Sequence, residues 1–366
     1  MDDRVLPFVL QSLSLSNISK LAGVLISSRE SAISDVVEAT GVLPDDAKQK
    51  LLAVCSKAAL LPALLDGHAH MGRVAGAGDM TEWKEKNMKG ASLIIANLDF
   101  HGEGVRRAPQ AGPNMVYALG IHPRFANQLY NIDLAAFAEC VRSGGFAAVG
   151  ETGLCSKWMK EKENPVRLHL QQKLLHFHIL VSKASGLPLI LHLRSNEGLD
   201  CLRTTSNMLE KEGLPYNHPI MIHCYKGQLE GANAWLTKWT ETLFSFNVCF
   251  PETLPVAAKL PLSNLTVESD APYLGKEPTS THVLIEQLAA LRQVSVEHLK
   301  LAMLSNMLRF LQPSLVASDN WPAVFEFAKS VAPKPTDRTV VSRHVRHLTT
   351  TTRPQLKWSE TDLENY

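Results

Sequence analysis

The sequence lacks the features that define several large classes of protein. Its six cysteines are scattered along 366 residues without a Cys-x-x-Cys pair, which argues against a disulfide scaffold and favours a reducing compartment. No apolar run approaches the roughly 18 residues that a membrane span requires. Lysine and arginine number 37 against 36 acidic residues, so the chain has no strong overall charge that would attract nucleic acid.

The amino terminus also lacks the pattern of a secretory signal. Met1-Asp2-Asp3-Arg4 opens with acidic residues, and Pro7 and a run of serines interrupt the apolar residues that follow. We therefore expect an intracellular protein, in the cytoplasm and/or the nucleus, without a membrane partner. A polyanionic partner would have to be held locally, by a metal or by a small basic patch.

Short apolar runs alternate with segments of helical spacing from Leu64 onward. This alternation predicts strands and helices that build a parallel sheet. Eight runs match the strand count of a (β/α)8 TIM barrel, and an open doubly wound sheet is the competing architecture. The runs are 64–66, 93–98, 115–121, 146–150, 188–192, 219–223, 243–248 and 265–268. Helical spacing is clearest over 167–180, 282–292 and 296–311.

Composition divides the chain into three parts. Residues 1–60, with Leu21, Val24 and Leu25 at helical spacing, are predicted to form a helical extension. Residues 61–315 are predicted to form the barrel. Residues 316–366 form a C-terminal extension that we expect to be flexible from about residue 333, because basic residues there fall among threonines, prolines and histidines.

The first apolar run leads into two histidines, His68 and His70. Because strand side chains alternate between faces, both imidazoles would point the same way. Two histidines on one strand can grip a divalent metal, whereas an isolated His-x-His is more often a polar stretch in a loop. The pair therefore needs partners before it indicates a site.

Four further runs carry potential ligands near their ends: Glu151, His192, His223 and Asp270. Each alone would be explained as a hydrogen-bonded core residue or a helix cap. In a barrel, however, the C-terminal ends of all strands meet at one mouth, where these groups would converge with the histidine pair. Burying so many polar groups without partners is costly, so their convergence predicts a metal site.

The ligand set is too large for one tetrahedral metal. We therefore expect two divalent ions (Mg, Mn or Zn), with Glu151 as the bridging carboxylate. Asp270 would bind metal and also accept the proton of an attacking water, because metal coordination lowers the pKa of water towards about 7. The predicted activity is hydrolysis.

Six short motifs follow one another along the chain: Asp66-Gly67-His68-Ala69-His70, Gly120-Ile121-His122-Pro123, Gly150-Glu151-Thr152-Gly153-Leu154, His192-Leu193-Arg194, His223-Cys224-Tyr225 and Glu268-Ser269-Asp270-Ala271-Pro272-Tyr273-Leu274. Two later stretches complete the set: Gly275-Lys276-Glu277-Pro278 and Ser305-Asn306-Met307-Leu308-Arg309-Phe310. In order and spacing, the set resembles the TatD family of metal-dependent deoxyribonucleases, from about Leu64 to Leu311.

The resemblance implies a barrel of the amidohydrolase type that carries divalent ions and cleaves phosphodiester bonds, often from the 3′ end of single-stranded DNA. It implies that His122 and Arg194 face the scissile phosphate. The planar guanidinium of Arg194 suits phosphate oxygens, with a structural arginine as the alternative. The metal ligands that it implies are His68, His70, Glu151, His192, His223 and Asp270.

Two positions depart from the family pattern. Cys155 stands where the family usually has Asp, and Tyr225-Lys226-Gly227 stands where it usually has Phe-Ser-Gly. The lost carboxylate puts catalytic efficiency in question, while Lys226 adds a cation that a phosphate can use. A passive substitution explains Cys155 better than a nucleophile does, because no activating base is assigned to it.

Aromatic residues near the mouth would suit a single-stranded substrate, whose bases stack on aromatic rings beside a basic track. Phe125, Trp158 and Tyr273 are candidates, with ordinary packing as the commoner explanation.

The main prediction is a metal-dependent deoxyribonuclease, a 3′-5′ exonuclease on single-stranded DNA with RNA as a further substrate. Asp270, Glu151 and His122 would be catalytic, and Arg194 and Lys226 would bind substrate. Two alternatives stay open. In the first, the same barrel serves as an amidohydrolase of a small amide, ester or lactone. In the second, the chain is a catalytically weakened scaffold whose terminal extensions bind a partner.

Overall fold

The computed structural model describes residues 64–71, 92–103, 115–156, 164–195, 200–314 and 318–331. The predicted extension at 1–60, the predicted flexible tail from 333 and Trp158 lie outside these residues. Within them, eight strands form one sheet in the order β1 to β8, and each strand pairs in parallel with the next. This sequential order confirms the TIM barrel and rules out the doubly wound sheet, in which the strand order reverses.

Each predicted run overlaps one strand, but several strands continue beyond the predicted run. β1 extends to Ala69 and β4 to Cys155, so His68 and Glu151 lie within strands and not after them. The polar side chains face the barrel mouth, and both residues lie where the strand register shifts, between Asp66 and Ala69 in β1 and between Val149 and Thr152 in β4. The strands are β1 Leu65–Ala69, β2 Leu93–Asp99, β3 Met115–Gly120, β4 Ala148–Cys155, β5 Leu189–Arg194, β6 Ile220–His223, β7 Thr242–Asn247 and β8 Leu265–Glu268.

The barrel closes where β1 meets the end of β8. The Asp270 N–H donates to the His68 carbonyl at 2.9 Å, and the His70 N–H donates to the Ala271 carbonyl at 2.7 Å. These two bonds place Asp270 directly beside the histidine pair, although the residues lie at opposite ends of the barrel sequence.

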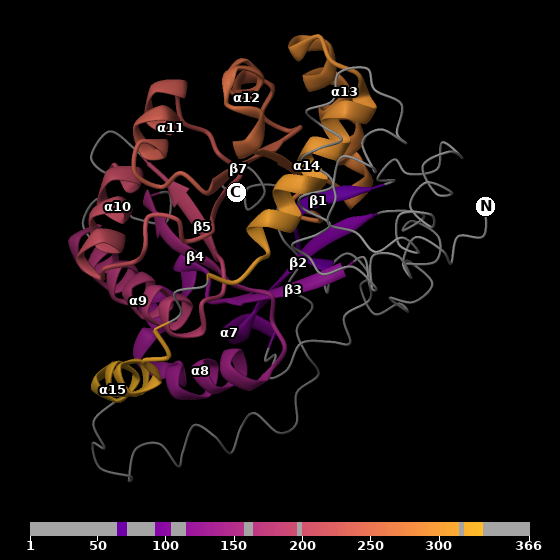
Figure 1. The fold of residues 1–366 in the computed structure, drawn as a ribbon. Helices are drawn as coiled ribbons and strands as arrows, with labels where there is room; N and C mark the ends of the chain where they lie inside the picture. Colours follow the sequence, from indigo (N-terminus) through magenta and orange to yellow (C-terminus); the bar gives the residue numbers. More distant parts are fainter. Residues whose placement is uncertain are drawn as a thin grey trace, which may run out of the picture.

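Helices cover the outside of the strands (Figure 1). Several begin at capping side chains: Asp133 accepts the Ala136 N–H at α8, and Ser295 accepts the His298 N–H at α14. The helices are α7 Phe100–Glu103, α8 Leu134–Ser143, α9 Asn164–Ser185, α10 Cys201–Lys211, α11 Leu229–Leu236, α12 Leu254–Lys259, α13 Thr281–Arg292, α14 Val296–Phe310 and α15 Trp321–Val331, with 3-10 turns η1 Pro123–Asn131, η3 Pro251–Thr253, η4 Leu262–Asn264 and η5 Pro278–Ser280. The predicted helices at 167–180, 282–292 and 296–311 correspond to α9, α13 and α14.

The last helix, α15, belongs to the predicted C-terminal extension but packs on the barrel. Val324, Ala328 and Val331 are buried, and the Phe327 ring stands 4.8 Å from that of His176 on α9. Figure 1 shows α15 beside α8 and α9. The domain boundary at residue 315 stays a prediction.

A glycine brings β4 and β5 close together near the mouth. Gly153 has φ +153°, and a Cβ at this position would collide with the His192 carbonyl oxygen. Gly153 also pairs with His192 in the strand register. The Gly-Glu-Thr-Gly motif therefore lets the Glu151 strand approach the His192 strand.

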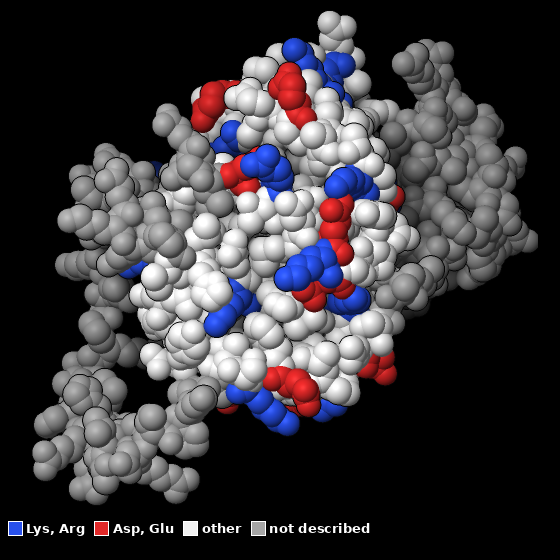
Figure 2. Space-filling view, turned by 90° about the vertical axis from the view of Figure 1, so that its left-hand side faces the viewer, with Lys and Arg blue, Asp and Glu red and all other residues white. Residues whose placement is uncertain are grey.

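The described surface mixes charges of both signs. Figure 2 shows basic and acidic side chains interspersed over the face it presents, in agreement with the formal net charge of +1. No helix of the described residues has the length and hydropathy to cross a membrane.

Two histidines away from the mouth are buried in their neutral form. His178 on α9 accepts the Ile121 N–H through Nε2 at 3.1 Å and donates through Nδ1 to the Leu174 carbonyl at 2.8 Å. His218 lies against Ser182 and the Leu187 carbonyl. Burial lowers the pKa of each to about 4, outweighing the carbonyl contacts that raise it.

We expect acid to destabilise the fold through these two histidines. Their pKa values in the folded protein lie below the ordinary value of 6.5. Their contribution to the free energy of unfolding is therefore complete above pH 6.5 and is lost as pH falls towards 4. The loss at pH 5 should be about 2 kcal/mol per histidine. Urea unfolding at pH 7.5 and 5.0 measures it. His178→Gln should flatten the pH dependence of the free energy of unfolding. His169→Gln, at an exposed position of the same helix, should not. An equal pH dependence in the wild type and both variants would contradict the assignment.

Candidate metal centre

The centre begins with the histidine pair of β1. The Nε2 atoms of His68 and His70 lie 3.3 Å apart, and both side chains are buried. The alternation of strand side chains brings them to the same face, as the sequence predicts. The His68 ring also stacks on the His223 ring, with centroids 4.1 Å apart, which joins β1 to β6 across the barrel mouth.

Glu151 lies between two groups of histidines. One carboxylate oxygen, Oε2, is 3.4 Å from His68 Nε2 and 3.6 Å from His70 Nε2. The other, Oε1, is 2.7 Å from His192 Nδ1 and 2.9 Å from His223 Nε2. Each oxygen thus faces a different pair, which is the arrangement that a bridging carboxylate requires.

Asp270 completes the first group. Its Oδ1 lies 3.4 Å from His70 Nε2 and 3.8 Å from His68 Nε2. The residue is 1% exposed, and its φ of 50° places the backbone in the left-handed region. Such a conformation is costly for a non-glycine residue and is often found at functional sites.

Burial and mutual interaction set the charges of these groups. Burial lowers the pKa of His68 and of His192, so both are neutral and able to bind metal. The pKa of Glu151 is held well below its usual range because His223 and His122 outweigh the effect of burial. Burial alone would lower the pKa of His223, but Glu151 and Glu268 raise it to about 9. A positive charge is therefore favoured between these two carboxylates.

The donor set fits metal ions. Buried ligand atoms without a hydrogen-bond partner among the described residues include His192 Nε2 and both carboxylate oxygens of Asp270. Leaving such atoms unsatisfied is costly, and cations would satisfy them. Three groups have ligand atoms within 4.8 Å of one another, namely His68/His70/Glu151, His122/Glu151/His192 and His68/His223/Glu268. These overlapping groups are consistent with a binuclear centre, and mixed nitrogen and oxygen donors suit several divalent metals.

His122 faces the centre as a hydrogen-bond donor. Its Nδ1 accepts the Arg124 N–H at 2.9 Å, so the proton of the neutral ring resides on Nε2. Burial lowers the pKa of His122 to about 3, although Glu151 opposes the effect. The Nε2 atom lies 3.5 Å from Glu151 Oε1 and has no hydrogen-bond partner among the described residues.

Arg194 borders the centre from β5. Its guanidinium donates to the Leu193 and His223 carbonyls at 3.1 and 3.2 Å, and its Nη2 lies 3.3 Å from His223 Nε2. Lys226 follows β6, and its Nζ stands 3.2 Å from the centroid of the Phe250 ring. Lys226 also lines a pocket with Arg194, beside the centre.

The remaining candidates occupy defined positions. Cys155 is 1% exposed, and its backbone N–H donates to Gln171 Oε1 at 2.8 Å, which supports a passive role. The Tyr273 ring contacts His70 with centroids 4.8 Å apart. Phe125 packs against His101 and lies under Arg124.

The sequence reasoning missed two acidic residues behind the ligands. Glu268 Oε1 lies 3.4 Å from His223 Nδ1, on the opposite edge of the ring from Glu151. Asp66 accepts the His68 N–H at 3.1 Å, the Ser269 N–H at 3.0 Å and the Ser269 hydroxyl at 2.5 Å. Each residue precedes a predicted ligand by two positions. Because strand side chains two residues apart point to the same face, the alternation that identified His68 and His70 could also have indicated Asp66 and Glu268.

Removing the Asp66 side chain should weaken closure of the barrel. Burial raises the pKa of Asp66 well above its usual range despite these hydrogen bonds. Asp66→Ala would leave two buried N–H groups without an acceptor, and we expect a loss of about 2–4 kcal/mol in the free energy of unfolding. Urea denaturation measures it. Asp133→Ala, which removes an exposed helix cap, should cost only about 1 kcal/mol; equal losses would refute the role given to Asp66.

The comparisons with known proteins agree with this geometry. Residues 65–312 match the family model described as TatD-related DNase. The uncharacterized metal-dependent hydrolase TatD of Mycobacterium tuberculosis is 26% identical over 228 residues, which cover 59% of this chain and 82% of that protein. The uncharacterized metal-dependent hydrolase YcfH of Escherichia coli K12 is 31% identical over 208 residues, covering 54% and 73% respectively.

A solved structure is also similar. The TatD family hydrolase of Entamoeba histolytica aligns with a TM-score of 0.49 at 16% identity, covering 68% of this chain and 97% of that one.

Proposed function

This chain is a metal-dependent hydrolase that belongs to the TatD-related DNase family, and from that premise we propose that it hydrolyses phosphodiester bonds of DNA. The proposed substrate is single-stranded DNA degraded from its 3′ end, with RNA as a further substrate. The observation that supports it best is Glu151, whose two oxygens face separate histidine pairs. A two-ion centre can stabilise both the attacking and the leaving oxygen of a phosphoryl displacement.

The six predicted ligands would hold the ions. These residues are His68, His70, Glu151, His192, His223 and Asp270. When bound, divalent ions supply Lewis acidity that neutralises phosphate charge and acidifies water. Glu268 fixes the His223 ring through its Nδ1 edge, and Asp66 fixes the backbone of His68. Such outer carboxylates orient ligands and tune their basicity.

The chain's other residues act on the substrate. Asp270 accepts the proton of the attacking water at a carboxylate oxygen, which has no hydrogen-bond partner among the described residues. His122 donates its Nε2–H to a phosphate oxygen, because Nδ1 is already occupied by the Arg124 N–H. Arg194 and Lys226 steady the negative charge of the strand at the edge of the centre.

The test is degradation of 5′-labelled single-stranded DNA. Protein loaded with Mg²⁺, Mn²⁺ or Zn²⁺ should produce a ladder that shortens from the 3′ end, stop on addition of a chelator and resume when metal is restored. A 3′-labelled strand would instead release labelled mononucleotide at once. If protein that is shown to hold metal leaves DNA and RNA intact, the proposal is overturned. Hydrolysis of a small ester or lactone by the same preparation would favour the amidohydrolase alternative.

We further propose a cytoplasmic or nuclear location. The five described cysteines (Cys140, Cys155, Cys201, Cys224 and Cys249) are all free thiols, as expected in a reducing compartment. Fractionation of cells that express the tagged full chain tests it, and recovery from an oxidising compartment would contradict it.

A further inference from the structure

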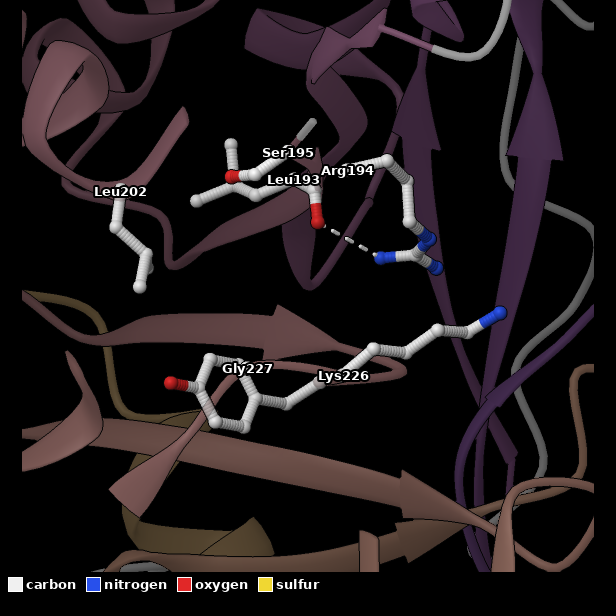
Figure 3. A pocket seen from close by; sticks show the side chains of 7 residues that line it. Leu193, Arg194, Ser195, Leu202, Lys226 and Gly227 are labelled. Carbon is white, nitrogen blue, oxygen red and sulfur yellow. Dashed lines mark hydrogen bonds between the residues drawn. The ribbon is translucent and has the colours of Figure 1, made fainter. Parts of the chain in front are cut away.

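A small pocket adjoins the metal centre between the ends of β5 and β6. It encloses about 160 Å³, and its described lining residues include Leu193, Arg194, Leu202 and Lys226, with no carboxylate among the lining residues that the structure describes. Figure 3 shows the Arg194 and Lys226 side chains extending to the same end of this pocket, whereas Leu202 lies at the opposite end. Two cationic side chains therefore line this pocket together with apolar residues.

Arg194 is buried, and Glu268 and Glu151 act on its charge without forming an ion pair with it. The residue is 6% exposed, and no described carboxylate lies within ion-pair distance of its guanidinium. Its Nη atoms contact two carbonyls and the His223 ring, while Nε is buried and has no hydrogen-bond partner among the described residues. A buried guanidinium that is only partly satisfied is costly, and an anion would offset that cost.

The neighbouring strand places no carboxylate in register with Arg194. Cys155 on β4 is the register partner of Arg194, so its side chain occupies the place from which a carboxylate would pair with the guanidinium. Lys226 adds a second cation, and its contact with the Phe250 ring holds the ammonium in place. The pocket thus carries two positive charges. Lys226 is itself a departure from the family pattern, and Arg194 pairs in the strand register with the other departure, Cys155.

We propose that Arg194 and Lys226 form a second anion subsite, which binds the phosphate group next to the scissile one on the same strand. This inference rests on the proposed function, because it assumes that the scissile phosphate lies at the metal centre. Arg194 contacts His223, so the two positions are adjacent. The planar guanidinium and the point charge of the ammonium both suit phosphate oxygens. The volume is below that of a drug-sized pocket, which fits a single group.

Binding of mononucleotides tests the subsite without requiring cleavage. Calorimetry compares thymidine 3′,5′-bisphosphate with the 3′- and 5′-monophosphates on the metal-loaded full chain. We expect the bisphosphate to bind at least about tenfold more tightly than either monophosphate. This factor corresponds to the free energy of one hydrogen bond to a charged group. Equal affinities would overturn the inference, whether or not DNA is cut. A bisphosphate preference in a protein that cuts no DNA would overturn the proposed function alone.

Variants assign the preference to the pocket. Lys226→Met should reduce the ratio of bisphosphate to monophosphate affinity towards one, whereas Lys259→Met, at an exposed position of α12, should preserve it. Cys155→Asp should also reduce the ratio, because the new carboxylate would pair with Arg194. Cys155→Asn, whose side chain has the shape of Asp without its charge, should not. Because each ratio is measured within one preparation, a partly unfolded variant does not distort it. A ratio that survives both Lys226→Met and Cys155→Asp would refute the assignment.

Dinucleotide substrates identify the side on which the second phosphate binds. The kcat/KM of thymidine dinucleotide is compared for forms with a 5′-phosphate, with a 3′-phosphate and with neither. A gain of about tenfold or more for one phosphorylated form locates the subsite on that side. Cleavage at equal rates for all three forms would contradict the subsite while leaving the nuclease activity established.

Discussion

Glu151→Gln should lower nuclease activity by at least about 10³-fold, equivalent to about 4 kcal/mol of transition-state stabilisation. The amide keeps one oxygen but replaces the other with an N–H₂ group, which cannot bind a cation. Because each carboxylate oxygen faces its own histidine pair, one of the two groups loses a ligand. We therefore also expect the metal content after dialysis to fall from two ions per chain towards one.

Metal content by mass spectrometry and single-turnover cleavage of labelled DNA measure the two effects together. Glu252→Gln is the matched control, because Glu252 is exposed at the turn before α12. A Glu151→Gln protein that keeps two ions and cleaves normally would exclude Glu151 as the bridge. Glu151→Ala removes both oxygens and should lose more metal than Glu151→Gln does.

Asp270→Asn should lower kcat by about 10²–10⁴-fold, the usual contribution of a general base. Asparagine has nearly the same shape and still offers one oxygen towards His70, but it cannot accept a proton. Asparagine also tolerates the positive φ of this position, so the backbone should be preserved. We expect metal content to be closer to that of the wild type than in Glu151→Gln, which separates loss of the base from loss of metal.

The control is Asp319→Asn, at an exposed position that also has positive φ. Steady-state kinetics with saturating metal gives kcat and KM for both variants. An Asp270→Asn protein within tenfold of wild-type kcat would show that another group accepts the proton, and the water-activating role would pass from Asp270.

Most of the fold was predictable because hydrophobic periodicity is local. Eight apolar runs separated by helical segments are enough to indicate a parallel barrel, and the helices over 282–292 and 296–311 agree with α13 and α14. Strand ends were less predictable. β1 and β4 continue through polar residues, because those side chains point into the barrel mouth and not into the apolar core.

For the candidate site, which stays a prediction, the sequence indicated residue types but not all the contacts. The six predicted ligands all lie together, yet Glu268 and Asp66 were not recognised. Asp66 acts on Ser269, 203 residues away, and Glu268 acts on His223, 45 residues away. Closure of the barrel makes Asp66 and Ser269 neighbours, and the order of β6, β7 and β8 in the sheet brings Glu268 near His223.

The sequence by itself therefore determined which chemical groups reach the mouth. Strand alternation and the convergence of parallel strand ends are properties of any barrel, so the order of His68, His70, Glu151, His192, His223 and Asp270 already implied a shared centre.

The tertiary structure decided how each group is placed there. It showed which oxygen of Glu151 faces which histidines, and that the Arg124 N–H leaves the proton of His122 on Nε2. It also brought Arg194 and Lys226 to one end of a pocket (Figure 3). These are matters of distance and direction between segments far apart in the chain, and side-chain packing across strands sets them.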